Sequence, residues 1–184
     1  MVQVVVVDYD PTWRDAFKRV RDFVAPVVAD CAVAIEHVGS TAVPGLAAKP
    51  IIDVDVVVAS PVTARTAIDR LATIGFEHRG DLGVPGREAF TRHPDLFPAN
   101  VYVVLRTCTA YRNHIALRNY LRAHPQAATE YGALKKELAQ KFPDDIDSYV
   151  DGKTDFIVGV LELAGLEAAE VKSVAKINKL PPQR

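Results

Sequence analysis

The sequence has few of the features that mark secreted, membrane-spanning or strongly basic proteins. Its two cysteines, Cys31 and Cys108, lie far apart with no metal-ligand spacing around either, so we expect reduced thiols rather than a disulfide framework. The formal net charge is −1, which gives no overall positive field to attract nucleic acid or an anionic membrane. No apolar run approaches the roughly 20 residues of a membrane span, and the first residues lack the basic leader and apolar length of a signal peptide. We therefore expect a cytoplasmic protein with neither a membrane nor nucleic acid as its partner.

Internal repeats and linker-like segments are also absent, and 184 residues suit one domain. We expect that domain to span residues 1–166 and to be followed by a loosely held tail over 167–184. Strand and helix patterns alternate through the first two-thirds of the chain, and helical patterns alone follow. The predicted strands cover 4–7, 32–38, 51–58, 88–92 and 100–106, and the predicted helices cover 11–29, 61–74, 111–123, 126–141 and 145–165. This order predicts an α+β fold in which a small mixed β-sheet has a helical C-terminal half packed against it.

The most informative residues are two aspartates, Asp53 and Asp55, in the middle of the most apolar predicted strand. Side chains alternate along a strand, so both carboxylates project from one face, about 7 Å apart along the backbone. Two like charges on a partly dry surface repel and are costly to desolvate, so they need a compensating cation. Hard carboxylate oxygens suit Mg²⁺ or Mn²⁺. The alternative is an edge strand on which one aspartate is solvated and the other caps a loop.

A glycine and a serine, Gly39 and Ser40, end the preceding predicted strand. Glycine lets the backbone approach a ligand closely, and the serine hydroxyl and the N–H groups after it, beginning with Thr41, can hold phosphate oxygens. A Gly-Ser turn alone is a weak signal. Followed by a short irregular segment and a strand with two spaced aspartates, it becomes a more specific combination that favours a site for phosphate and metal.

That combination resembles the signature of the nucleotidyltransferase superfamily, whose fold is like that of DNA polymerase β. More narrowly, residues 35–54 (IEHVGSTAVPGLAAKPIIDV) resemble the hallmark segment of the GrpB family. Three later segments are similar to the same family, namely 117–122, 131–135 and 149–153. The resemblance covers about residues 4–163 and implies a nucleotidyltransferase-type fold.

The resemblance also implies roles for the residues that match the motif. Asp53 and Asp55 would bind metal and carry catalysis, while Gly39 and Ser40 would hold the β- and γ-phosphates of a nucleoside triphosphate. The metal would orient the α-phosphate and neutralise charge while an acceptor oxygen displaces pyrophosphate.

A third metal ligand is harder to place. The superfamily takes a third carboxylate from a later strand, where the GrpB pattern has two histidines separated by one residue. Asn100 and Tyr102 stand at those positions here, and neither is a strong ligand for a hard metal. Glu88, on the neighbouring predicted strand, is an alternative whose facing the sequence leaves open.

Five further residues are candidates for contacts with substrate. Lys49 lies just before the predicted strand that carries the aspartates. It either binds a phosphate or is simply an exposed lysine. His37 lies two residues before the glycine of the turn and is expected to share its facing. Lys153 falls within an apolar stripe of the last predicted helix, one turn after Tyr149, which favours a pocket over a snorkelling side chain. Arg118 belongs to a basic stripe with a four-residue spacing, which is either a solvated face or an anion-binding wall opposite the aspartates.

Three hypotheses about function follow. The first is an enzyme that uses Mg²⁺ to transfer a nucleotidyl group from a nucleoside triphosphate to a small-molecule acceptor, with carboxylate activation and amide formation as a variant. The second is a nucleotide- or metabolite-binding module that kept the pocket but lost the third ligand. The third, a partner-binding domain with merely solvated aspartates, leaves the Gly-Ser turn and the aspartates unexplained together.

Overall fold

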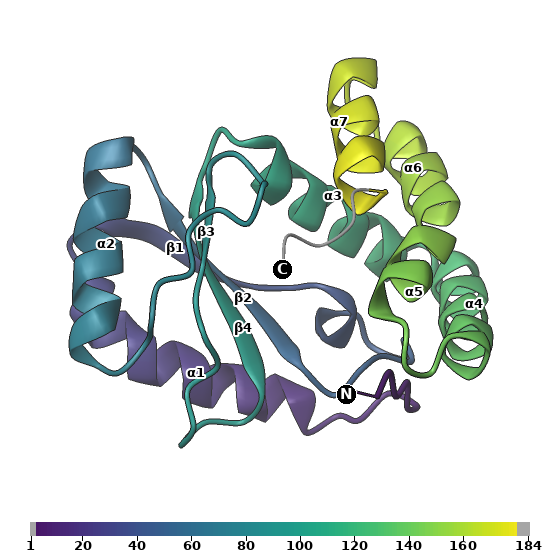
Figure 1. The fold of residues 1–184 in the computed structure, drawn as a ribbon, viewed down its shortest axis with the longest axis horizontal. Coiled ribbons are helices and arrows are strands. Elements are labelled where there is room, and N and C mark those ends of the chain that lie inside the picture. Colours follow the sequence, from purple (N-terminus) through teal and green to yellow (C-terminus); the bar gives the residue numbers. More distant parts are fainter. Residues whose placement is uncertain (1–2, 180–184) are drawn as a thin grey trace.

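The computed structural model describes residues 3–179, and a mixed β-sheet lies at the centre of this part of the chain (Figure 1). The sheet has the strand order β1 (Ala32–Val38), β2 (Ile52–Val58), β4 (Ala99–Leu105) and β3 (Arg87–Ala89). β2 runs antiparallel to β1 and parallel to β4, and β3 runs antiparallel to β4. The strands predicted for the aspartates and for the segment before the Gly-Ser turn are confirmed.

One face of the sheet is covered by two helices, α1 (Trp13–Val28) and α2 (Pro61–Thr73). Valines at alternate positions of β2 and β4 face these helices and form the main hydrophobic core with them. The helix α2 begins as the sequence predicts, because the Ser60 hydroxyl accepts a hydrogen bond from the Thr63 N–H and Pro61 occupies the first turn.

The helical C-terminal half packs beside the other face of the sheet, as predicted (Figure 1). It consists of α3 (Thr109–Ala123), α4 (Pro125–Lys141), α5 (Ile146–Gly152), α6 (Thr154–Leu163) and α7 (Ala168–Asn178). A second apolar cluster, which includes Leu46, Leu121 and Leu161, joins these helices to the turn before β2. Among the described residues, no helix has both the length and the apolarity that a membrane crossing requires.

Two predicted elements differ in the structure. The strand predicted at 4–7 is reduced to a single bridge between Val7 and Ala48, because Val4 turns away to pack against Leu138 and Tyr149. The helix predicted at 145–165 is divided into α5 and α6 at Gly152, a residue with low helix propensity.

The tail expected to be loosely held after residue 166 contains the helix α7 over most of its described length. Val171 and Val174 of this helix are buried in the second apolar cluster. Their spacing of three residues places both on one helical face, a pattern too short to stand out in a charged segment. That expectation is therefore corrected for residues 168–178, and residues 180–184 lie outside the described part.

Candidate functional site

The two aspartates lie on the same face of β2, the face turned toward the helical half. In the strand register, Asp53 is opposite Asn100 and Asp55 is opposite Tyr102 on β4. On the β1 side, Asp55 is opposite Glu36. The predicted facing follows from the two-residue period of the strand. The two carboxylates have different surroundings, since Asp55 is fully buried and Asp53 is partly open to a pocket.

The turn between β1 and β2 brings its glycine against Asp53. Gly39 has φ +70°, and a Cβ atom at this position would lie 2.2 Å from Oδ2 of Asp53. Any other residue would both strain the backbone and displace the carboxylate. Ser40 follows at the start of the short 3₁₀ helix η1 (Ser40–Ala42). The predicted closeness of the Gly-Ser turn and the aspartate strand is confirmed.

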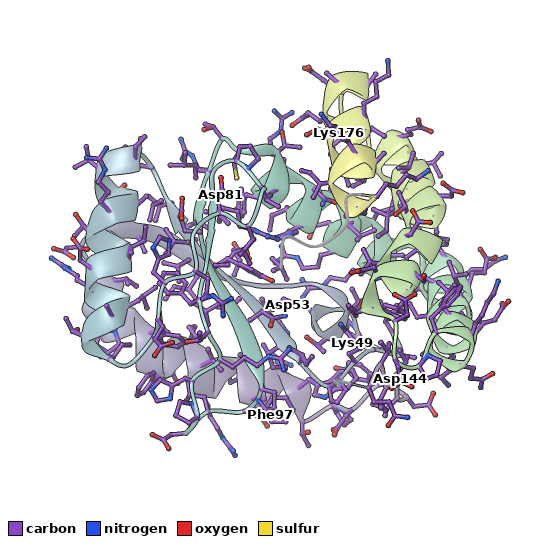
Figure 2. The ribbon with its side chains drawn as sticks, in the orientation of Figure 1. Lys49, Asp53, Asp81, Phe97, Asp144 and Lys176 are labelled. Atoms are coloured by element: carbon purple, nitrogen blue, oxygen red, sulfur yellow. The ribbon has the colours of Figure 1, made fainter. Side chains whose placement is uncertain are left out.

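A pocket with a volume of about 170 Å³ opens beside Asp53. Three lysines from three different segments line it, namely Lys49 before β2, Lys135 on α4 and Lys153 between α5 and α6. Figure 2 shows Lys49 beside Asp53. Its other lining residues are Ser40, Thr41, Ala48, Ile51, Asn100 and Tyr149. Six of the residues predicted for phosphate, substrate or metal binding therefore converge on one pocket: Ser40, Thr41, Lys49, Asp53, Tyr149 and Lys153.

Lys135 belongs to this site although the sequence analysis did not select it. Its side chain is only 2% exposed, and its ammonium group lies 4.6 Å from the centre of the Tyr131 ring. The ammonium group donates a hydrogen bond of 2.8 Å to the Ser40 hydroxyl, which ties α4 to the Gly-Ser turn. A signal was present in the sequence, because Lys135 lies on the buried stripe of α4 with Tyr131 and Leu138. The reasoning that selected Lys153 from an apolar stripe applies equally to Lys135.

The three lysines are held in a pocket that disfavours their positive charges. Burial, together with the charge of Lys153, lowers the pKa of Lys135 to about 6. Burial and the charge of Lys49 lower the pKa of Lys153 to about 8, and burial lowers the pKa of Lys49 as well. Burial raises the pKa of Asp53. A bound anion would reduce this penalty on the lysines.

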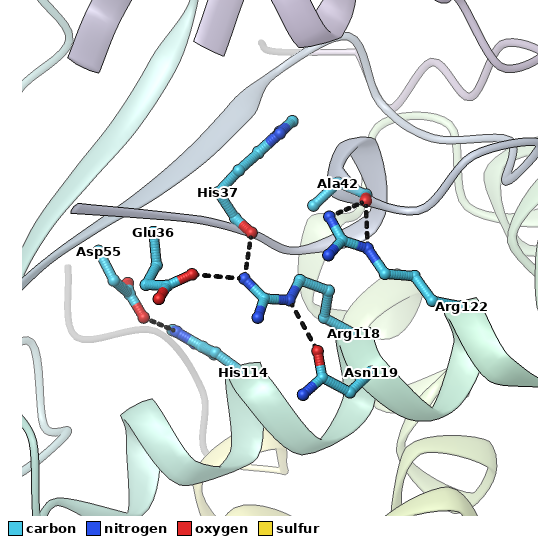
Figure 3. Close-up of polar contacts among 8 residues, drawn as sticks. All are labelled: Glu36, His37, Ala42, Asp55, His114, Arg118, Asn119 and Arg122. Carbon is cyan, nitrogen blue, oxygen red and sulfur yellow. Dashed lines mark hydrogen bonds and ion pairs between the residues drawn. The ribbon is translucent and has the colours of Figure 1, made fainter. Parts of the chain in front are cut away.

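Asp55 does not line this pocket, and it contacts a histidine of α3. Nδ1 of His114 lies 2.8 Å from Oδ2 of Asp55, an interaction between elements 59 residues apart (Figure 3). Burial opposes protonation of His114, but the neighbouring Asp55 carboxylate outweighs it and raises the pKa of the imidazole. Oδ1 of Asp55 is buried and has no hydrogen-bond partner within residues 3–179. Sequence spacing alone gave no sign of this pair.

The basic stripe of α3 does not form the expected anion-binding wall. Arg118 donates hydrogen bonds to the Glu36 carboxylate and the His37 carbonyl oxygen, at 2.8 and 2.9 Å (Figure 3). Arg122 donates two to the carbonyl oxygen of Ala42. These arginines fasten α3 to β1 and η1. Arg118 therefore has protein partners, and it does not line the lysine pocket.

His37 is also directed away from the lysine pocket. It is paired with Val54 in the sheet register, and so it faces the side that α1 covers. Its ring stacks on Phe17 with the centroids 4.6 Å apart, and Nε2 lies 3.0 Å from the Thr41 hydroxyl. Burial, helped by the charges of Arg122 and Arg118, lowers the pKa of His37 to about 4. His37, a candidate for contacts with substrate, therefore does not line the lysine pocket.

The structure also settles which later residues lie near the aspartates. Glu88 is paired with Val103, on the face opposite to Asp53, and its carboxylate lies 2.7 Å from Nε2 of His78. It therefore cannot supply the third carboxylate. Asn100 instead donates a hydrogen bond of 2.8 Å from its amide to Oδ1 of Asp53.

The donor atoms at the aspartates suit a hard cation only in part. Within residues 3–179 no group of three or more His, Cys, Asp or Glu side chains is arranged to hold a metal ion. Oδ2 of Asp53 and the unpartnered Oδ1 of Asp55 nevertheless offer two carboxylate oxygens on one strand face. Mg²⁺ is commonly bound by one or two carboxylates, with substrate phosphates and water as its other ligands. These residues fit a Mg²⁺ ion that arrives with a phosphate ligand.

Comparisons with known proteins match most of the chain to one family. A family described as GrpB protein matches residues 3–163. The chain is 34% identical over 155 residues to the UPF0157 protein YqkA of Bacillus subtilis, in an alignment that covers 84% of this chain and 45% of YqkA. It therefore spans less than half the length of that relative.

Solved structures give the same picture of the fold. The crystal structure of the conserved protein GrpB from Enterococcus faecalis superimposes with a TM-score of 0.78 at 35% identity, covering 92% of this chain and 98% of that one. The Cid1 poly(U) polymerase bound to MgGTP superimposes with a TM-score of 0.50 at 16% identity, covering 74% of this chain and 44% of that one. At this identity the second likeness concerns the fold alone, and that fold is of nucleotidyltransferase type.

Proposed function

Because this chain belongs to the GrpB family and has a fold of nucleotidyltransferase type, we propose that it is a Mg²⁺-dependent nucleotidyltransferase. It would act in the cytoplasm and transfer a nucleotidyl group from a nucleoside triphosphate to a small-molecule acceptor. The family and the fold are consistent with this proposal, and the lysine pocket is its main structural support.

The observation that supports it best is the convergence of three lysines and Ser40 beside Asp53. A pocket of about 170 Å³ accommodates a chain of phosphates but leaves no room for a whole nucleotide. Phosphate chains carry several negative charges, and these offset the cost of holding three ammonium groups in a partly dry pocket. The Lys135–Ser40 hydrogen bond ties α4 to the Gly-Ser turn, whose hydroxyl and N–H groups would contact such a ligand.

The aspartates would hold the cation. Asp53 and Asp55 lie on one face of β2, and Gly39 has no Cβ that would displace the Asp53 carboxylate. When bound there, Mg²⁺ would neutralise charge on the phosphates and polarise the α-phosphorus. The residues of this chain align the phosphates along the lysines while an acceptor oxygen forms a bond to the α-phosphorus. The bond from that phosphorus to the β-phosphate oxygen breaks, and pyrophosphate leaves.

A second candidate function is a nucleotide-binding module without turnover. The position of Asn100 favours it, since its amide occupies one Asp53 oxygen and supplies no carboxylate. The burial of Asp55 against His114 favours it too. The two functions share the pocket and differ in whether bound triphosphate is cleaved.

Thermal shift and calorimetry with the four nucleoside triphosphates, each with and without Mg²⁺, test the shared part of the proposal. A ligand present at 100 times its Kd stabilises the native state by about 2.7 kcal/mol. We expect a Mg²⁺-dependent rise in the unfolding temperature that disappears in Asp53→Asn. In Lys135→Met the affinity for the triphosphate should fall at least tenfold. Lys136→Met is the matched control, since the neighbouring Lys136 is exposed and pairs with Asp8 away from the pocket.

Pyrophosphate release then separates the enzyme from the module. Release that requires Mg²⁺ and Asp53 supports the transferase. Tight binding without release across a broad acceptor panel supports the module, and the absence of any triphosphate binding would refute both functions.

A further inference from the structure

A second cavity adjoins the lysine pocket. It has a volume of about 470 Å³, and it shares Lys49 and Ile51 with the smaller pocket as a common wall. In Figure 2, Lys49 lies between Asp53 on one side and Asp144 of the second cavity on the other. A molecule in this cavity therefore lies next to the phosphate chain of the proposed nucleotide.

The walls of the cavity are aliphatic. Val4, Val5, Ile51, Pro98 and Ile146 contribute side chains from the N-terminal segment, the start of β2, the turn before β4 and the start of α5. Val5 and Ile146 are 47% and 41% exposed, so both side chains are accessible to a ligand. Among the described residues that line this cavity, none is aromatic. An aliphatic ligand fits these walls better than a nucleobase, which proteins commonly hold by stacking on aromatic rings.

Three charged side chains stand around these walls, namely Lys49, Arg92 and Asp144. Neither Arg92 nor Asp144 forms an ion pair with another residue in the described part of the chain. Nε of Arg92 donates a long hydrogen bond, 3.4 Å, to Oδ1 of Asn100, whose amide contacts Asp53. The cationic end of the cavity is therefore the end closest to the proposed site of phosphoryl chemistry.

The chemistry at Asp53 points to the same kind of acceptor. A hydroxyl acceptor must give its proton to a base before or during attack. The strand position next to Asp53 carries the amide of Asn100, which is not a base. The other carboxylates on that face are paired, Asp55 with His114 and Glu36 with Arg118. An acceptor that is already an anion needs no base, neither a carboxylate nor the amine of Lys135.

We propose that this cavity is the acceptor subsite and that the acceptor is an aliphatic carboxylic acid, with its carboxylate between Lys49 and Arg92. The inference rests on the proposed nucleotidyl transfer. A carboxylate oxygen forms a bond to the α-phosphorus of the triphosphate, and the bond from that phosphorus to the β-phosphate oxygen breaks. The products are an acyl nucleotide and pyrophosphate, and no proton is transferred.

The test uses three ligands with the same branched carbon skeleton, namely isocaproate, its α-amino derivative leucine, and isohexanol. Binding of each to the nucleotide-free protein is measured by saturation-transfer NMR. Acid-dependent exchange of labelled pyrophosphate into the triphosphate is then measured with Mg²⁺. We expect both signals with at least one of the acids and neither with the alcohol. A preference for leucine that Asp144→Asn removes identifies an amino acid, and equal use of the two acids identifies a simple carboxylic acid.

Two variants locate the effect in this cavity. Arg92→Met should raise the acid concentration for half-maximal exchange at least tenfold while leaving triphosphate affinity within twofold of wild type. Arg79→Met, an exposed arginine outside the cavity, is the matched control. Ile146→Trp fills the cavity and should abolish acid binding in the absence of nucleotide.

Failure of this inference is distinct from failure of the proposed function. Pyrophosphate release with the alcohol, or acid binding that survives Ile146→Trp, overturns the acceptor assignment and leaves the transferase standing. If the wild-type protein does not bind any triphosphate with Mg²⁺, the proposed function falls, and the acceptor role falls with it.

Discussion

Replacing Lys135 by methionine removes the most strongly disfavoured charge in the pocket while keeping the length and apolar volume of the side chain. The pKa of Lys135 is about 6 in the folded protein, against an ordinary lysine value of 10.5. Between these two values the unfolded chain holds a proton that the folded chain lacks. Lys135 therefore contributes stability that is fully present above the unfolded pKa and is lost as the pH falls toward 6.

The size of this effect follows from one proton. A difference of one bound proton changes the free energy of unfolding by about 1.4 kcal/mol for each pH unit. Between about pH 6.5 and about pH 8, wild type should therefore gain roughly 2 kcal/mol relative to Lys135→Met. Urea unfolding of both proteins across this pH range measures the difference between their free energies of unfolding. The contributions of the other titrating groups are common to both proteins and cancel in this difference. Lys136→Met should run parallel to wild type, because Lys136 is exposed.

The same ionisation predicts proton uptake on anion binding. At pH 7 about nine-tenths of the Lys135 side chains would be neutral in the free protein, and a bound phosphate chain would favour the charged form. Calorimetry with tripolyphosphate in two buffers of different ionisation enthalpy should report nearly one proton taken up by wild type and much less by Lys135→Met. A pH-independent stability difference together with no proton uptake would refute the view that Lys135 is held neutral in the empty pocket.

Gly39→Ala should abolish triphosphate binding and destabilise the fold by about 2 kcal/mol, because the new Cβ would clash with Asp53 and the backbone has a positive φ. Denaturant unfolding measures the loss of stability, and a thermal-shift assay with nucleotide measures the loss of binding. His114→Ala leaves Asp55 buried without its partner and should cost about 3 kcal/mol at neutral pH, whereas an unchanged unfolding midpoint would contradict the pairing. Arg118→Met should loosen α3 from β1 without changing triphosphate affinity, so hydrogen exchange should rise in α3 while calorimetry of nucleotide binding stays as in wild type.

The local part of this site could be predicted from the sequence. Alternation along β2 fixes the common facing of Asp53 and Asp55, and the Gly-Ser turn fixes where the chain reverses beside them. These features depend on residues close together in the chain. The same holds for the start of α2, where a serine and a proline determine the cap.

The rest of the site depends on contacts between segments that are far apart in the chain, and the spacing of residues in the sequence does not reveal these contacts. Arg118 reaches Glu36 across 82 positions and Lys135 reaches Ser40 across 95. The sequence analysis treated Arg118 as a substrate ligand because its carboxylate partner on β1 could not be identified in advance. His37 was placed by counting from Gly39, but β1 ends at Val38, so the alternation does not extend to the glycine.

The two aspartates look equivalent in the sequence, but the fold gives them different electrostatic partners. The charge of Asp55 is balanced inside the protein by His114, on an element that also anchors the helical half. The charge of Asp53 faces three lysines across a pocket, so its balance changes when a ligand enters. A phosphate chain would compensate the lysines and leave Asp53 without nearby positive charge, unless a cation arrived with it. On the proposed function, we therefore expect a triphosphate and Mg²⁺ to bind more tightly together than either does alone.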